Sequence, residues 1–166
     1  MSASDNPSKT EIMFYHLERS TLDTTLPLLL EKTLQRGWKA VVQPSSLARV
    51  AALDTHLWVW KDEAFLPHAS SEDPAFTDSL ASQPIVLTAA ADNPNEAEVL
   101  FLVDGAKREA VDGFTRCIVI FDGRDEEALA AARQYWSALK DAKYPLTYWQ
   151  EKERGKWEKG AEANTE

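Results

Sequence analysis

The sequence predicts a single-domain α/β protein, a three-layer sandwich built around a mostly parallel sheet. Three observations support this prediction: short apolar runs alternate with amphipathic stretches, two of the runs are continuous enough to be central strands, and the length suits one domain. The chain has 166 residues, of which 44% are hydrophobic and 27% are charged, an ordinary balance for a globular domain. A hydrophobic core of useful size is therefore expected.

The N-terminal part of the chain alternates strands and helices. The predicted strand, helix, strand and helix cover residues 11–17, 20–37, 38–43 and 44–58. The first strand is short and rich in β-forming residues, and it follows a polar leader, residues 1–10, that we expect to be mobile. In both helices the apolar residues recur at helical spacing, and Gly37 follows the first helix as a stop signal.

A polar stretch separates this part from the next strands. Residues 69–84 contain two prolines and predict a surface loop, because the strand-like residues 84–89 follow at once. The apolar runs 99–105 and 117–123 both end on Asp-Gly and predict central parallel strands. The chain therefore remains one domain through this region.

The last predicted helix covers about residues 124 to 142, with an apolar stripe made of Leu129, Ala132, Trp136 and Leu139. Acidic residues lie in its first turn and lysines near its end, as the helix dipole favours. We place the domain over residues 1–159 and expect residues 160–166 to be a disordered charged tail. Trp157 stands out among charged neighbours, and either folds back onto the domain or meets a partner.

Composition excludes several classes of protein. The net charge of −9 repels phosphate backbones, so little direct nucleic-acid binding is expected. Cys117 is the single cysteine, which excludes an internal disulfide and predicts a buried thiol in a reducing cytoplasm. The sequence has no secretory leader and no apolar run of membrane-spanning length, so we expect neither secretion nor membrane insertion.

The motifs of cofactor and metal sites are missing. The six glycines never cluster into a phosphate-binding loop, and there is no G-x-S-x-G nucleophile elbow. His16, His56 and His68 show no metal-binding spacing, so we interpret them as hydrogen-bonded structural residues. The sequence therefore predicts no cofactor and no metal, and favours a binding module.

Asp104 and Asp122 support the alternative, a nucleotide-binding or Mg²⁺-dependent phosphotransfer enzyme. They end neighbouring predicted strands, where α/β sheets bind ligands and where carboxylates can hold Mg²⁺ beside phosphates. Asp-Gly also forms turns, because Asp caps them and Gly adopts positive φ. Both interpretations stay open on this evidence.

The stretch HLWVWKDEAFLPH, residues 56–68, is unusually aromatic. It contains Trp58, Trp60 and Phe65, and ends on Pro67 and His68. Aromatic side chains bury large areas, and Trp also carries an N–H that needs a partner. The cluster is therefore either part of the core or a docking face.

Five segments occur in order over about residues 11 to 158: MFYHL, LWVWKDEAFLPH, PIVL, VLFLVDG and LTYWQEKERGKWEK. Together they resemble the chi subunit family of the bacterial DNA polymerase III holoenzyme. The resemblance implies a Rossmann-like fold without a nucleotide site, and an accessory clamp-loader protein without catalysis. It also implies two partners: the small psi subunit, or another clamp-loader subunit, and the acidic C-terminal tail of single-stranded DNA-binding protein.

The resemblance also implies which residues meet these partners. By motif position, the candidates for the psi-facing side are Trp58, Trp60, Phe65, Pro67 and His68. The alternative is that Trp58 or Trp60 packs under the sheet edge. If the segment is extended, alternation puts both tryptophans on one side.

The last predicted helix supplies the candidates for the tail site. Arg133 lies where the family carries a tail-contacting arginine, with Trp136, Lys140 and Arg124 as further candidates. A second basic residue of some relatives, one helical turn earlier, corresponds here to Leu129, and this difference bears on the strength of tail binding. The alternative for Arg133 and Lys140 is a solvated helix face with ordinary charge partners.

Overall fold

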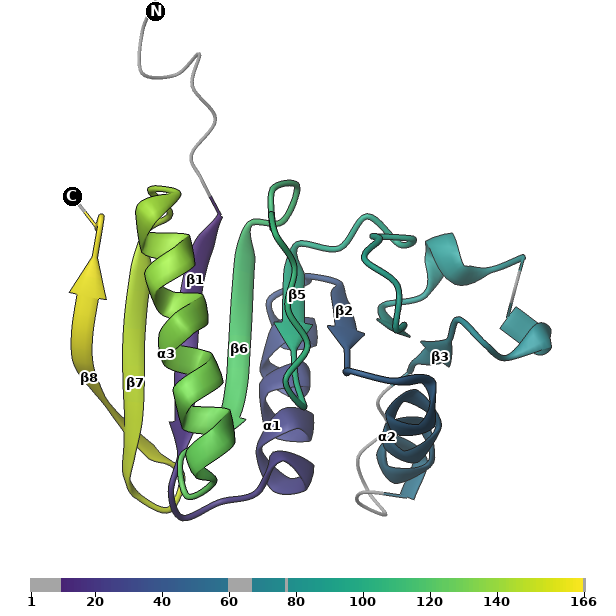
Figure 1. The fold of residues 1–166 in the computed structure, drawn as a ribbon. Helices are drawn as coiled ribbons and strands as arrows, with labels where there is room; N and C mark the ends of the chain where they lie inside the picture. The colour runs from purple at the N-terminus through teal and green to yellow at the C-terminus, as the bar shows by residue number, and fades with distance from the viewer. Residues whose placement is uncertain (1–9, 60–66, 77, 166) are drawn as a thin grey trace, which may run out of the picture.

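The computed structural model describes residues 10–59, 67–76 and 78–165 and contains one eight-stranded sheet (Figure 1). The strand order is β3-β4-β2-β5-β6-β1-β7-β8, and every neighbouring pair is parallel except the antiparallel pair β7–β8. The strands are β1 (Glu11–Leu17), β2 (Ala40–Gln43), β3 (Ala69–Ser70), β4 (Ile85–Leu87), β5 (Val99–Leu102), β6 (Arg116–Asp122), β7 (Leu146–Glu153) and β8 (Lys156–Ala163). The predicted α/β class with a mostly parallel sheet is confirmed.

In the described residues, three α-helices complete the layers. They are α1 (Leu22–Gln35), α2 (Leu47–Val59) and α3 (Glu126–Asp141), and the 3-10 turns are η2 (Pro74–Phe76) and η3 (Leu80–Ser82). Residues of α3 pack into a core on one face of the sheet, and residues of α1 and α2 pack into a second core on the other face. The molecule is therefore a three-layer sandwich, as the sequence predicts. None of the described helices combines the length and the apolar character of a membrane span.

The connections from two neighbouring strands run in opposite directions across the sheet. From β1 the chain passes through α1 to β2, whereas from β6 it passes through α3 to β7. The carboxyl ends of β1 and β6 lie side by side, paired as Leu17 with Asp122. This is a topological switch point, where open α/β sheets leave a crevice.

The C-terminus differs from the prediction. The expected disordered tail over residues 160–166 is wrong as far as Ala163, because β8 continues to that residue and pairs with Leu146 on β7. Trp157 folds back onto the domain, with its ring centroid 4.9 Å from that of Tyr15. The Asn164 amide then donates to the carbonyls of Lys140 and Tyr144, both at 3.0 Å, and holds the end of the strand against the domain.

Two further segments test the sequence analysis. The predicted surface loop 69–84 contains the two-residue strand β3, which pairs with β4 at the edge of the sheet. Cys117 is fully buried on β6, and burial raises the pKa of its thiol to about 12. The prediction of a buried thiol at this position is therefore confirmed.

Candidate functional site

Helix α3 presents the residues predicted for the tail site. The Asp125 carboxylate caps the helix by accepting hydrogen bonds from the backbone N–H groups of Glu127 and Ala128, at 2.9 and 3.3 Å. The side that faces the sheet buries Ala132, Tyr135 and Leu139. Trp136 and Leu129, which the predicted stripe also includes, are only partly buried at the edge of this core. Tyr135 is the core residue that the predicted stripe omits.

An aromatic cluster lies at the junction of α3 with the sheet. The ring of Trp136 lies 5.3 Å from that of Phe14 on β1 and 5.8 Å from that of Tyr148 on β7. Trp136 and Tyr148 are both partly exposed, whereas Phe14 is fully buried beneath them. The junction therefore offers accessible aromatic surface on a rigid base. We call Trp136, Tyr148, Arg133 and Lys140 the α3–β7 face.

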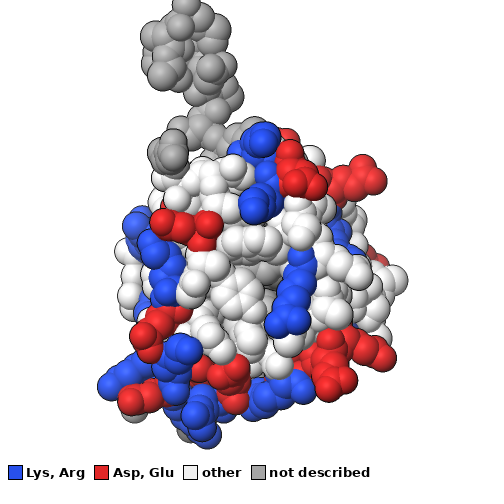
Figure 2. All heavy atoms as spheres, turned by 60° about the vertical axis from the view of Figure 1, so that its left-hand side comes forward, with Lys and Arg blue, Asp and Glu red and all other residues white. Residues whose placement is uncertain are grey.

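Cationic side chains border this aromatic surface. Arg133 and Lys140 are exposed on α3, on either side of Trp136 in sequence. Figure 2 shows this side of the molecule, where a hollow of uncharged side chains lies between groups of Lys and Arg. Arg133 acts electrostatically on Tyr148: burial raises the pKa of that hydroxyl, and the positive charge of Arg133 opposes the rise. The structure thus brings three of the four predicted tail residues to one side of the molecule.

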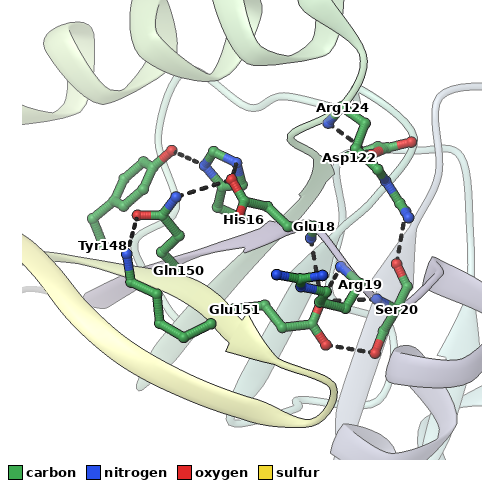
Figure 3. A network of polar contacts seen from close by, with 10 residues as sticks. His16, Glu18, Arg19, Ser20, Asp122, Arg124, Tyr148, Gln150 and Glu151 are labelled. Atoms are coloured by element: carbon green, nitrogen blue, oxygen red, sulfur yellow. Dashed lines mark hydrogen bonds and ion pairs between the residues drawn. The ribbon is translucent and has the colours of Figure 1, made fainter.

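Arg124, the fourth predicted tail residue, is held by hydrogen bonds within the chain. Its Nε donates to Asp122 Oδ1 at 2.8 Å, and its terminal nitrogen donates to the Ser20 carbonyl at 2.8 Å. The guanidinium therefore ties the turn after β6 to the turn after β1 (Figure 3). It does not join the α3–β7 face.

A polar network that the sequence analysis missed supports the α3–β7 face from below. Nδ1 of the buried His16 and the Tyr148 hydroxyl lie 2.5 Å apart and share a hydrogen bond (Figure 3). Nε2 of His16 lies 3.1 Å from Glu18 Oε1, an ion-pair distance without hydrogen-bond alignment. Burial lowers the pKa of the imidazole; Glu18 opposes this shift and Arg133 adds to it. A Cβ at Gly123 would lie 1.8 Å from His16 Nε2, so this packing requires glycine.

Among the carboxylates of this network, Glu151 accepts the most hydrogen bonds. It is fully buried, and its Oε1 accepts hydrogen bonds from the backbone N–H groups of Glu18, Arg19 and Ser20. Its Oε2 accepts from the Ser20 hydroxyl at 2.5 Å and from the Gly155 N–H at 2.9 Å. Burial alone would raise the pKa of this carboxyl, but these hydrogen bonds outweigh it and lower the pKa to about 2. Glu151 therefore joins the turn after β1 to the β7–β8 hairpin.

The aromatic stretch occupies the end of α2. Because α2 continues to Val59, the extended conformation considered for Trp58 is wrong. The Trp58 side chain is 47% exposed and Val59 is 72% exposed, so the helix ends in accessible apolar surface. Trp60 and Phe65 lie outside the described residues.

His68 and Pro67 lie beside this apolar surface. The His68 ring is buried, with its centroid 4.1 Å from that of Trp58, and its Nε2 lies 3.2 Å from both the carbonyl oxygen and Oδ1 of Asp54. His68 therefore positions Trp58 and offers no exposed surface of its own. Pro67 is partly buried next to it.

The two strand-end carboxylates are engaged by arginines. Arg49 Nε donates to Asp104 Oδ2 at 2.8 Å, and Arg124 contacts Asp122 as described above. Asp122 Oδ1 also accepts from the Arg124 backbone N–H at 2.9 Å, which is the turn-forming role. Across the described parts of the chain, no group of three or more His, Cys, Asp or Glu residues could hold a metal ion. The geometry thus favours turn formation over phosphotransfer.

Comparison with known proteins identifies the family. The model of the family described as "DNA polymerase III chi subunit, HolC" matches residues 10–147, which includes α2, α3 and the start of β7. The chain is also 30% identical over 119 residues to the "Probable DNA polymerase III subunit chi" of Rickettsia prowazekii (strain Madrid E), covering 68% of this chain and 70% of that relative. This chain belongs to the DNA polymerase III chi subunit family.

Proposed function

We propose that this chain links the clamp-loader assembly of the replicative polymerase to the acidic C-terminal tail of single-stranded DNA-binding protein. Family membership establishes the coarser role of a DNA replication accessory subunit. The finer role is supported by the α3–β7 face, where Arg133 and Lys140 border partly exposed aromatic rings. We expect this role to need no cofactor. We also expect it to be carried out in the cytoplasm, because a single unpaired cysteine, Cys117, suits a reducing compartment.

The α3–β7 face suits an acidic peptide with an apolar end. A guanidinium binds a carboxylate through two parallel hydrogen bonds, so Arg133 is the strongest candidate for the terminal carboxylate or an acidic side chain. The partly exposed rings of Trp136 and Tyr148 offer an apolar surface beside it. Because the whole chain carries a net charge of −9, an acidic ligand must be captured by such local cations at short range.

Charge reversal at Arg133 tests the tail site. Arg133→Glu replaces an attraction by a repulsion and should weaken binding of a fluorescent tail peptide at least about tenfold, equivalent to about 1.4 kcal/mol. Fluorescence anisotropy at low and moderate salt measures the affinity, which should fall as salt rises. Lys32→Glu is the matched control, because Lys32 is an exposed helical cation on α1, across the sheet. Equal affinities of the wild type and Arg133→Glu, or salt-independent binding, would contradict the assignment.

The end of α2 is proposed as the face that meets a psi-like subunit or another clamp-loader subunit. Trp58 and Val59 expose apolar side chains there, and tryptophan is a common anchor of protein interfaces. Trp58→Ala should weaken clamp-loader association by about 2 kcal/mol, with a smaller loss in unfolding free energy because the ring is about half exposed. Binding to the purified clamp-loader subunits measures the first quantity, and chemical denaturation the second. A large loss in unfolding free energy with unchanged affinity for the clamp-loader subunits would assign Trp58 to the core.

The α2 proposal includes residues with indirect roles. His68 contributes through its contact with Trp58, and Pro67 through its place beside that ring. Trp60 and Phe65 remain candidates from the sequence alone. Substituting Val59 by Ser provides a second test that leaves Trp58 and His68 in place, because Val59 is 72% exposed.

A further inference from the structure

A cavity of about 540 Å³ opens at the topological switch point of the sheet. It lies among the carboxyl ends of β1, β5 and β6 and the first turns of α1 and α3. Open α/β sheets bind their ligands in this position, and the volume falls within the roughly 300–1,000 Å³ typical of ligand sites. Neither Arg133 nor Trp58 lines it, so it is separate from both proposed faces.

The walls of this switch-point cavity are largely apolar. They include strand-end side chains and small residues on one side of α3, namely Leu102, Val119, Phe121, Ala128, Ala131 and Ala132. Because these helical residues have only methyl side chains, they leave room beside the sheet that a larger residue would fill. Moving an apolar group from water into the cavity would therefore be favourable.

The rim of the cavity carries an excess of negative charge. Four carboxylates and two cations line it: Asp104, Asp122, Asp125, Glu127, Lys107 and Arg124. The pairing of Asp104 with Arg49 offsets part of this excess. Within the described ranges, Glu127 forms no ion pair, and it is exposed on the first turn of α3.

The same residues disfavour a phosphate. In nucleotide-binding sheets the N–H groups at a helix N-terminus bind the phosphate. Here two such N–H groups, those of Glu127 and Ala128, already donate to the Asp125 carboxylate. A ligand that combines an apolar group with positive charge matches both the walls and the rim.

The mouth of the cavity is open. Asp104, Asp122 and Arg124 are exposed around it, and a Cβ placed on Gly105 would meet nothing within 4 Å. Pockets for small molecules typically cover 70–90% or more of the ligand's surface. A cavity with an open mouth cannot cover so large a share. A side chain that projects from a larger molecule needs no such cover. We propose that the switch-point cavity docks an apolar side chain of a partner polypeptide that is flanked by Lys or Arg.

Two short peptides test the charge rule. Acetyl-Lys-Leu-Lys-amide and acetyl-Glu-Leu-Glu-amide carry the same apolar side chain and opposite charges. In a titration of the ¹⁵N-labelled full-length chain followed by NMR, the cationic peptide should shift the amide signals of Gly105 and Ala131 saturably. The acidic peptide should bind about tenfold more weakly or not at all, because like charges meet at the rim.

A pair of helix variants separates the cavity from general attraction to an acidic protein. Ala131→Leu fills the cavity and should abolish the saturable shifts, whereas Ala130→Leu changes an exposed residue of the same helix that does not line it, and should preserve them. Thermal unfolding checks that both variants fold, and Ala128→Leu replaces Ala131→Leu if that variant does not. Undiminished binding to the filled cavity, equal binding of the acidic peptide, or no saturable shift would each overturn the proposal.

Discussion

Replacing Glu151 by Gln should destabilise the protein by about 3 kcal/mol or more at pH 7. The variant keeps the size of the side chain but removes the charge and turns one acceptor into a donor. If its oxygen keeps the three N–H groups of residues 18–20, the new amide NH₂ faces the Gly155 N–H, and two donors meet. Losing a charge-assisted hydrogen bond costs about 1.5 to 3 kcal/mol, and leaving a buried donor unpaired costs about 1 to 3 kcal/mol.

The stabilisation by Glu151 should depend on pH in a defined direction. The folded pKa of about 2 lies below the ordinary value of 4.5, so the ionised carboxylate stabilises the fold. This contribution is fully present above about pH 5 and is lost as the pH falls towards 2. At about 1.4 kcal/mol per pKa unit, the depression corresponds to about 3 kcal/mol, and it arises from the same hydrogen bonds.

Urea denaturation of the wild type and Glu151→Gln at pH 7, 5 and 3 measures this contribution. The difference in unfolding free energy should be nearly the same at pH 7 and pH 5 and clearly smaller at pH 3. Glu153→Gln is the matched control, because Glu153 lies on the same strand but its side chain is 72% exposed and forms an ion pair with Lys156 at 3.4 Å. It should change stability by less than about 0.5 kcal/mol. Equal effects of the two substitutions, or a difference that does not change with pH, would refute the role of Glu151.

Two further predictions concern residues at the carboxyl ends of β5 and β6. Gly123→Ala should cost at least about 2 kcal/mol of stability, because its Cβ would lie 1.8 Å from His16 Nε2; thermal unfolding should show a much smaller cost in a His16→Ala background. ATP with Mg²⁺ should not raise the melting temperature, since Asp104 and Asp122 are each bound by an arginine; a dose-dependent rise that Asp122→Asn abolishes would instead support the enzyme hypothesis.

The elements with strong local patterns were predictable from the sequence. The apolar runs that became β5 and β6, and the amphipathic helix α3 with its acidic first turn, follow from short-range periodicity. The β7–β8 hairpin was not, because charged residues dominate β8, as is common on edge strands, and hide its pattern. Strand β3 has only two residues, too few for a pattern.

The candidate sites were predictable only in part. Family resemblance pointed to Arg133, and Trp136 followed as an aromatic neighbour on the same helix; both lie at the α3–β7 junction. The sequence could not show that Arg124 binds Asp122 and the Ser20 carbonyl, because Ser20 is 104 residues from Arg124 along the chain. The same holds for His16 and Tyr148, 132 residues apart, whose hydrogen bond depends on the pairing of β1 with β7. Contacts between distant segments leave no local signal in a single sequence.

The central claim is that one chain connects two partners through two separate faces, and a pull-down with three forms of the protein tests it directly. Wild-type protein, Arg133→Glu and Trp58→Ala would each be used to capture partners from a lysate of the source cell. We predict that the wild type recovers both clamp-loader subunits and single-stranded DNA-binding protein. Arg133→Glu should lose only single-stranded DNA-binding protein, and Trp58→Ala should lose the clamp-loader subunits. Recovery of neither partner by the wild type, or identical recoveries with all three forms, would contradict the claim.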